Sequence, residues 1–89
     1  MRAIVTVIGR DRVGIIAEVC ALLSAREINI LDISQTILQE YFTMIMLVDC
    51  SKCPVSFVEL ADELRSAGAA SALDIRVQRE DIFNAMHRI

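Results

Sequence analysis

The strongest constraint on the fold of this chain is a change in the period of its apolar residues. Residues 3–9 form a β-branched run that ends at Gly9 and is too short for a helix, which is typical of a central strand. Over residues 12–26 the apolar residues recur at helical spacing instead, at Ile16, Val19, Cys20 and Leu23. The pattern therefore predicts a strand and then an amphipathic helix, with Asp11 as the N-cap of that helix.

The middle of the chain returns to strand character. Residues 28–38 are β-branched, and a slip in their alternation predicts a β-bulge near Leu31 and Asp32. Residues 39–40 separate this run from residues 41–49, so we expect a tight hairpin there. Residues 41–49 carry apolar side chains on both faces, which indicates an inner strand that is covered on both sides.

A second helix and a last strand follow. Ser56 and Glu59 form an S-x-x-E capping box, and Gly68 is placed to end the helix that this box begins. Residues 73–78 alternate between apolar and polar, as a half-exposed edge strand does. The apolar stripe expected of the second helix consists of Phe57, Leu60, Ala61 and Leu64.

The order βαββαβ predicts an α+β fold, the ferredoxin-like sandwich. Short connections and right-handed crossovers give a four-stranded antiparallel sheet in the order 4-1-3-2, with both helices on one face. Residues 1–79 form this single domain, and residues 80–89 form a C-terminal tail. The tail is too short to be a stable helix alone, so we expect it to pack on the bare sheet face or on a partner subunit. Its apolar residues at helical spacing are Ile82, Phe83, Met86 and Ile89.

Composition limits the partners. Apolar residues make up 55% of the chain, which favours an exposed apolar patch and hence a homodimer. The net charge is -3 and the basic residues are scattered, so we expect neither nucleic acid nor a membrane as partner. Nothing at the N-terminus resembles a signal peptide and no apolar run approaches bilayer length, so we expect a cytoplasmic location.

No catalytic, cofactor or metal site is predicted. Cys50 and Cys53 form a C-x-x-C pair, but a structural zinc site needs four ligands and the other candidates are only Cys20 and His87. Reduced loop thiols are the favoured interpretation, although a soft-metal or redox site stays an alternative. His87 is the only histidine and lies in the tail, so we expect a protein that is not an enzyme.

The turn at residues 9–14 is the first candidate for binding. Unpaired N–H groups and the positive end of a helix dipole gather there and suit a carboxylate. Asp11 could meet an ammonium group of the same ligand, and Arg10 or Arg12 could add an anion contact, so the turn suits a zwitterion. Spacing alone favours a plainer interpretation, in which Asp11 only caps the helix and both arginines are solvated.

Two further strings make the chain resemble an ACT domain. Residues 11–17 read DRVGIIA and residues 29–35 read NILDISQ, and together with the element order they match nearly the whole chain. The tail EDIFNAMHRI, residues 80–89, resembles more narrowly a family of small stand-alone prokaryotic proteins that consist of a single ACT domain. That family is similar to the ACT repeats of the glycine cleavage system repressor.

The resemblance implies a regulatory module that binds an amino acid between two domains whose sheets join side by side. The chain departs from many ACT domains at Val13, because a proline often stands at this position before the glycine. We therefore expect a dimeric sensor for an amino acid or similar zwitterion that signals to a separate protein. A ligand-free interaction module, acting through an edge strand or the tail, is the alternative, and an RNA-binding domain is a third option that the acidic charge disfavours. The implied ligand-binding residues are Asp11, Arg12, Val13, Gly14 and Ile15 of one subunit and Asn29 and Ile30 of the other.

Overall fold

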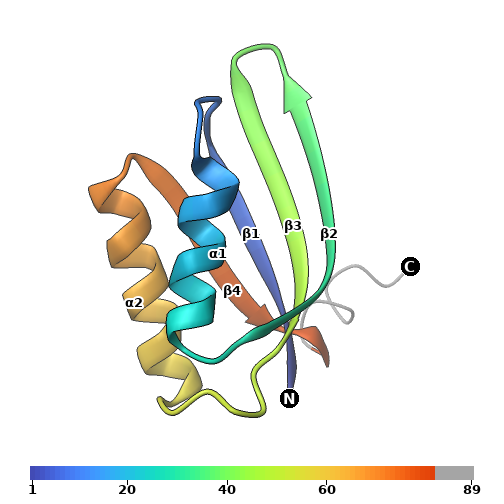
Figure 1. Ribbon diagram of the computed structural model, residues 1–89, viewed down its shortest axis with the longest axis vertical. Helices are drawn as coiled ribbons and strands as arrows, with labels where there is room; N and C mark the ends of the chain where they lie inside the picture. Colours follow the sequence, from blue (N-terminus) through green and yellow to red (C-terminus); the bar gives the residue numbers. More distant parts are fainter. Residues whose placement is uncertain (82–89) are drawn as a thin grey trace.

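The computed structural model describes residues 1–81. Its four strands pair antiparallel in the order β2-β3-β1-β4, which confirms the expected ferredoxin-like sandwich. In chain order the elements are β1 (Arg2–Arg10), α1 (Ile15–Ala25), β2 (Asn29–Leu38), β3 (Tyr41–Asp49), α2 (Phe57–Ala70) and β4 (Leu73–Arg79) (Figure 1).

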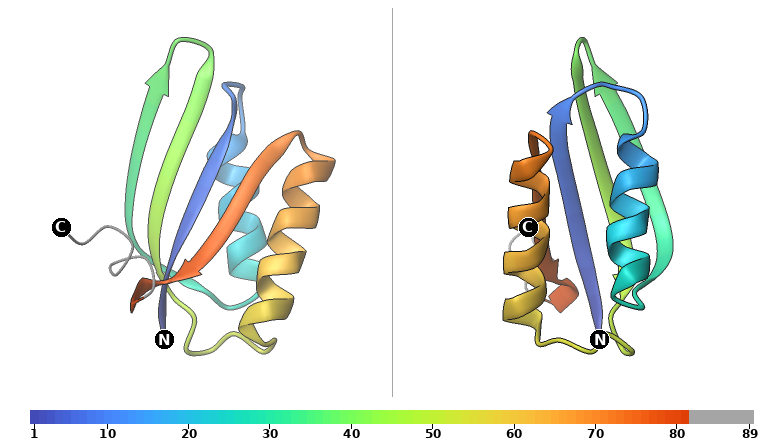
Figure 2. Two further views of the ribbon diagram at one scale, coloured as in Figure 1. Left: turned by 180° about the vertical axis from the view of Figure 1, so that it is seen from behind. Right: turned by 60° about the vertical axis from the view of Figure 1, so that its left-hand side comes forward.

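α1 and α2 cover the same face of the sheet (Figure 2). The core lies between the helices and the sheet, and every buried side chain among residues 1–81 is apolar. Neither α1 nor α2 is long and apolar enough to cross a membrane. On the strands, the buried residues are Ala3, Val5 and Val7 of β1, Phe42, Met44, Met46 and Val48 of β3, and Leu73, Ile75 and Val77 of β4.

The bulge and the hairpin predicted around β2 are confirmed. The pairing of β2 with β3 shifts between Ile30 and Asp32, which leaves Leu31 as the extra residue. Gln39 has a φ of 56°, so this non-glycine residue supplies the left-handed conformation of the turn between the two strands.

The expected cover on both sides of β3 is confirmed on one side only, and cover on the other side stays a prediction. β3 is an inner strand, but the described residues cover only its helix-facing side. On the opposite side, Tyr41 is 45% exposed and Ile45 is 42% exposed. Both helices of a βαββαβ chain cross over the same face, so apolar residues on both sides of β3 do not mean that both sides are covered by this part of the chain.

The predicted start of α1 is also wrong. The N-cap is Gly14, and Asp11 lies three residues earlier, where its backbone N–H donates to the carbonyl oxygen of Glu40 at 2.7 Å. The buried stripe of α1 is Ile15, Val19 and Leu23, whereas Ile16 is 38% exposed. The helix carries two overlapping apolar stripes, and its orientation on the sheet decides which of them is buried.

In α2 the predicted cap is confirmed but the predicted end is wrong. The Ser56 hydroxyl accepts a hydrogen bond from the Glu59 N–H at 3.2 Å. The helix continues past Gly68 to Ala70. Gly68 is buried against β4, and a Cβ on it would lie 2.8 Å from the Leu73 carbonyl oxygen and 2.8 Å from Ile75 Cγ1. The glycine is therefore needed for close packing and not for a turn.

Gly68→Ala is expected to destabilise the fold by about 1–3 kcal/mol, because its methyl group overpacks the contact between α2 and β4. Alanine favours a helix over glycine by about 1 kcal/mol, so propensity alone predicts the opposite sign. Urea unfolding of the wild type and of Gly68→Ala measures the difference in the free energy of unfolding. Ser66→Ala, at an exposed position of the same helix, is the control and should be neutral or stabilising.

The predicted tail lies almost wholly outside the described residues. Glu80 and Asp81 are described and have helical conformation. The packing predicted for Ile82, Phe83, Met86 and Ile89 therefore stays a prediction.

Candidate functional site

The turn from β1 into α1 leaves a helix N-terminus without a side-chain cap. Gly14 has a φ of 90°, a left-handed conformation that glycine adopts readily, and no side chain caps the helix. The first hydrogen bond of α1 joins the Glu18 N–H to the Gly14 carbonyl at 2.9 Å. The N–H groups that precede it in the first turn have no partner within the helix and carry its positive end.

This N-terminus opens into a hollow of about 210 Å³. One wall is the turn and the first residues of α1, and the facing wall comes from β2 and the start of β3. An anion would meet backbone N–H groups on the first wall, and the Asp11 carboxylate supplies negative charge on the same rim. The lining residues are Asp11, Arg12, Gly14, Ile15, Ile16, Ala17, Gln35, Ile37 and Phe42.

The structure brings together four of the seven implied site residues: Asp11, Arg12, Gly14 and Ile15. Val13 is 99% exposed at the tip of the turn. Asn29 and Ile30 lie at the opposite end of the sheet, where Asn29 pairs with Asp49. The length of β3 separates the two groups by roughly 25 Å at the usual rise of a strand. Within one chain they do not form one site.

The seven implied site residues do not include the facing wall. Gln35 and Ile37 project from β2 on the helix side of the sheet, in register with Met44 and Phe42. A signal for Gln35 was present, because its amide interrupts an otherwise β-branched strand. Nothing in the sequence alone distinguishes Ile37 from a core residue, although it is 52% exposed.

Arg12 is held by an ion pair. Its Nη2 lies 2.7 Å from Glu18 Oε2 and also donates to the Ser71 carbonyl oxygen at 3.3 Å. The Ser71 hydroxyl donates to the other oxygen of Glu18. These contacts tie the turn to the loop between α2 and β4, so Arg12 positions the turn and its charge is largely balanced by Glu18.

This network gives a pH prediction. The hydrogen bond from Ser71, followed by that from Arg12, lowers the pKa of Glu18 from its ordinary value of 4.5. A lowered folded-state pKa contributes stability above the ordinary value, and this contribution is lost as the pH falls through the folded-state pKa. Between pH 5 and pH 3, Glu18→Gln should therefore lose less stability than the wild type. Urea unfolding over this pH range measures how steeply the free energy of unfolding falls in the wild type and in Glu18→Gln. An equal fall in both proteins would contradict the network.

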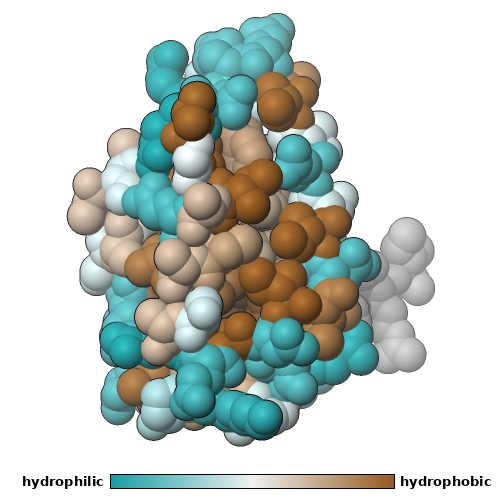
Figure 3. Space-filling view, viewed as in Figure 1, coloured by the Kyte–Doolittle hydropathy of each residue, from teal (hydrophilic) through white to brown (hydrophobic). Residues whose placement is uncertain are grey.

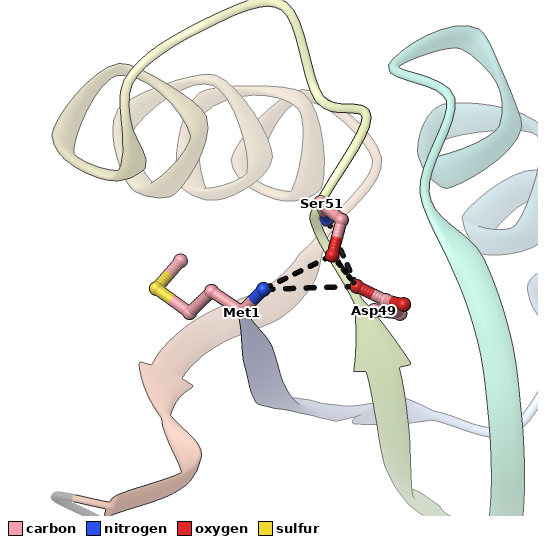
Figure 4. A network of polar contacts seen from close by, with 3 residues as sticks. All are labelled: Met1, Asp49 and Ser51. Atoms are coloured by element: carbon pink, nitrogen blue, oxygen red, sulfur yellow. Dashed lines mark hydrogen bonds and ion pairs between the residues drawn. The ribbon is translucent and has the colours of Figure 1, made fainter.

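Asn29 lies in a different hollow of about 360 Å³, lined by Glu27, Asn29, Asp49, Ser51 and Lys52. Beside it, Asp49 Oδ1 accepts hydrogen bonds from the Ser51 hydroxyl at 2.5 Å and the Ser51 N–H at 2.9 Å (Figure 4). These bonds lower the pKa of Asp49. The amino group of Met1 donates to the Ser51 hydroxyl at 3.1 Å. This end of the sheet is polar and separate from the turn.

Cys50, the first cysteine of the C-x-x-C pair, is buried. Burial raises the pKa of the Cys50 thiol, which disfavours the thiolate that metal binding and redox chemistry use. Over residues 1–81, no three side chains of His, Cys, Asp or Glu are grouped to hold a metal ion.

The geometry can be compared with known proteins. The ACT domain family model matches residues 2–78. The chain belongs to the ACT domain family. It is 56% identical over 89 residues to a UPF0237 protein of Clostridium acetobutylicum, with all of both chains covered. It is 52% identical over 87 residues to a UPF0237 protein of Neisseria meningitidis, covering 98% of this chain and 97% of that one. It therefore also belongs with the UPF0237 proteins, as its tail suggested.

Solved structures agree with the fold of this ACT domain. An ACT domain protein from Streptococcus pneumoniae superposes with a TM-score of 0.84 at 41% identity, with 98% of each chain covered. A structure assigned as a glycine cleavage system transcriptional repressor has a TM-score of 0.70 at 25% identity, covering 86% of this chain and 44% of that one. The family likeness points to a regulatory module.

Proposed function

We propose that this ACT domain binds an amino acid or a similar small zwitterion in the hollow at the start of α1 and signals to a separate protein. The observation that carries the proposal is the uncapped N-terminus of α1, which opens into the hollow beside the Asp11 carboxylate. The backbone N–H groups would hold the ligand carboxylate, and Asp11 would hold the ammonium group. The apolar side chains of Ile16 and Ile37 would contact the ligand side chain.

A homodimer would complete this site. β2 is an edge strand, and every residue from Leu31 to Leu38 is exposed. Hydrophobic side chains gather beside α1 over the β2 edge (Figure 3). An unpaired strand edge with exposed apolar residues favours pairing with another strand. The exposed apolar residues of β2 are Leu31, Ile33, Ile37 and Leu38.

The two-fold symmetry of such a dimer explains the separated site residues. If β2 pairs antiparallel with β2 of a second copy, the Leu38 end of one strand lies beside the Asn29 end of the other. Asn29 and Ile30 of the second copy would then approach the turn of the first. The roughly 25 Å within one chain is therefore compatible with one site across two chains.

The relatives support this proposal in part. The match to the ACT domain family and the likeness to a glycine cleavage system repressor favour ligand-dependent regulation. Beyond what these relatives favour, we propose that the ligand is an amino acid and that the signal passes to a separate protein.

Calorimetric titration of the wild-type protein with each of the common amino acids tests the function. We expect saturable binding of at least one of them, with one ligand per turn. Absence of binding by all of them would overturn the sensor and leave the interaction module as the function to pursue. The exposed apolar edge of β2 favours that second candidate.

A further inference from the structure

The sheet face opposite the helices carries an apolar stripe with polar borders. In the register of β1 and β3, Ile4 lies beside Leu47 and Thr6 lies beside Ile45. Farther along, the stripe continues with Ile8 and Tyr41, which are each 45% exposed. On either side the neighbouring strands place polar residues: Asp74, Arg76 and Gln78 of β4, and Asp32, Ser34 and Thr36 of β2.

The described chain ends at one end of this stripe and on its side of the sheet. Arg2 alternates with the buried Ala3, so its side chain projects from the face opposite the helices. Arg2 Nη2 lies 2.9 Å from Glu80 Oε2. The ion pair therefore holds the Glu80 carboxylate beside Arg2, whose side chain projects from the same uncovered face as Ile4. Glu80 and Asp81 have helical conformation, so the chain begins a helical turn there.

We propose that residues 82–89 of the same chain form one amphipathic helix that covers this stripe. Eight helical residues span about 12 Å, and the four residue-to-residue steps from Ile4 to Ile8 span about 13 Å of strand. The lengths therefore match. The segment carries its apolar residues on one helical face, which would contact Ile4, Leu47 and Ile45. These residues are Ile82, Phe83, Met86 and Ile89.

The same chain is favoured over a second copy because the ion pair of Arg2 with Glu80 already places the start of the segment on its own sheet. Docking then needs no loop, and its entropic cost is only that of ordering eight residues. With the stripe covered, this face would not be available to another copy of the chain or to a nucleic-acid base. The β2 edge and the hollow at α1 would stay accessible.

A tryptophan reporter tests the docking, since the chain contains no tryptophan. Phe83→Trp should emit at a shorter wavelength than Asn84→Trp and should be quenched several-fold less by iodide, because position 84 lies on the opposite face of the proposed helix. Adding Ile45→Asp to Phe83→Trp should shift the emission to that of Asn84→Trp. Adding Val58→Asp, at a 70% exposed position on α2, should leave the emission unchanged.

Equal emission and equal quenching of the two reporters would overturn the proposal. A change in Phe83→Trp emission on thousandfold dilution would assign the segment to a second copy and would overturn docking in the same chain. In the wild type, nuclear Overhauser contacts between the Phe83 ring and the Ile45 methyl groups provide a measurement that needs no substitution. Neither result depends on whether a ligand binds at the hollow.

Discussion

Gly14→Val is expected to abolish ligand binding while the fold is retained. Gly14 has a φ of +90°, a conformation that costs a β-branched residue about 1–3 kcal/mol, and nothing lies within 4 Å of the position its Cβ would take. The valine would therefore not clash with the protein. Relaxation of its backbone would turn the free N–H groups of α1, and its side chain would fill part of the hollow. We expect binding to weaken at least about a hundredfold, which is about 2.8 kcal/mol.

Two variants serve as controls in the same calorimetric titration. Ala21→Val introduces the same side chain at an exposed position of α1 away from the hollow and should leave the ligand affinity unchanged. Gly14→Asn tolerates the left-handed conformation better than valine and should bind with intermediate affinity. Wild-type affinity in folded Gly14→Val would contradict a site at this turn.

Ile33→Lys is expected to convert the proposed dimer into a monomer and to weaken ligand binding with it. Ile33 is 41% exposed on β2 and does not line the hollow, so the substitution acts on the edge and not on the ligand directly. A lysine on each copy would place like charges near each other across a two-fold interface. We expect the dimer dissociation constant to rise by about a hundredfold or more, measured by sedimentation.

The control for this variant is Val58→Lys, which makes the same kind of change at a 70% exposed position on α2. It should leave both the dimer and the ligand affinity unchanged. A monomeric Ile33→Lys that binds ligand with full affinity would contradict a site shared between two chains. An unchanged dimer would contradict pairing through β2.

The sequence predicted most of the fold because each element carries its own local signal. The period of the apolar residues distinguishes strands from helices, and the slip near Leu31 indicates the bulge. The Ser56 cap depends on neighbours within four residues, so it too is local. A βαββαβ order then leaves few topologies, since crossovers are right-handed and connections are short.

Where the sequence analysis was wrong, the deciding contact was distant along the chain. The sequence predicts a helix end at Gly68, but the role of this glycine depends on the approach of β4, whose residues lie five or more positions later. The sequence also predicts Asp11 as a helix cap, yet the Asp11 backbone N–H donates to the carbonyl oxygen of Glu40 at the hairpin. Neither contact changes the spacing of the apolar residues around Gly68 or Asp11, so the sequence pattern does not predict it.

The candidate site also has one part that the local sequence predicts and another that depends on distant contacts. By itself the sequence determined the turn with Gly14 and Asp11, because a strand, a glycine and a helical stripe follow one another along the chain. Only the tertiary structure decided that Gln35 and Ile37 face this turn and that Asn29 lies at the other end of the sheet. Strand pairing sets which side chains share a hollow, and pairing depends on register between residues far apart in the sequence.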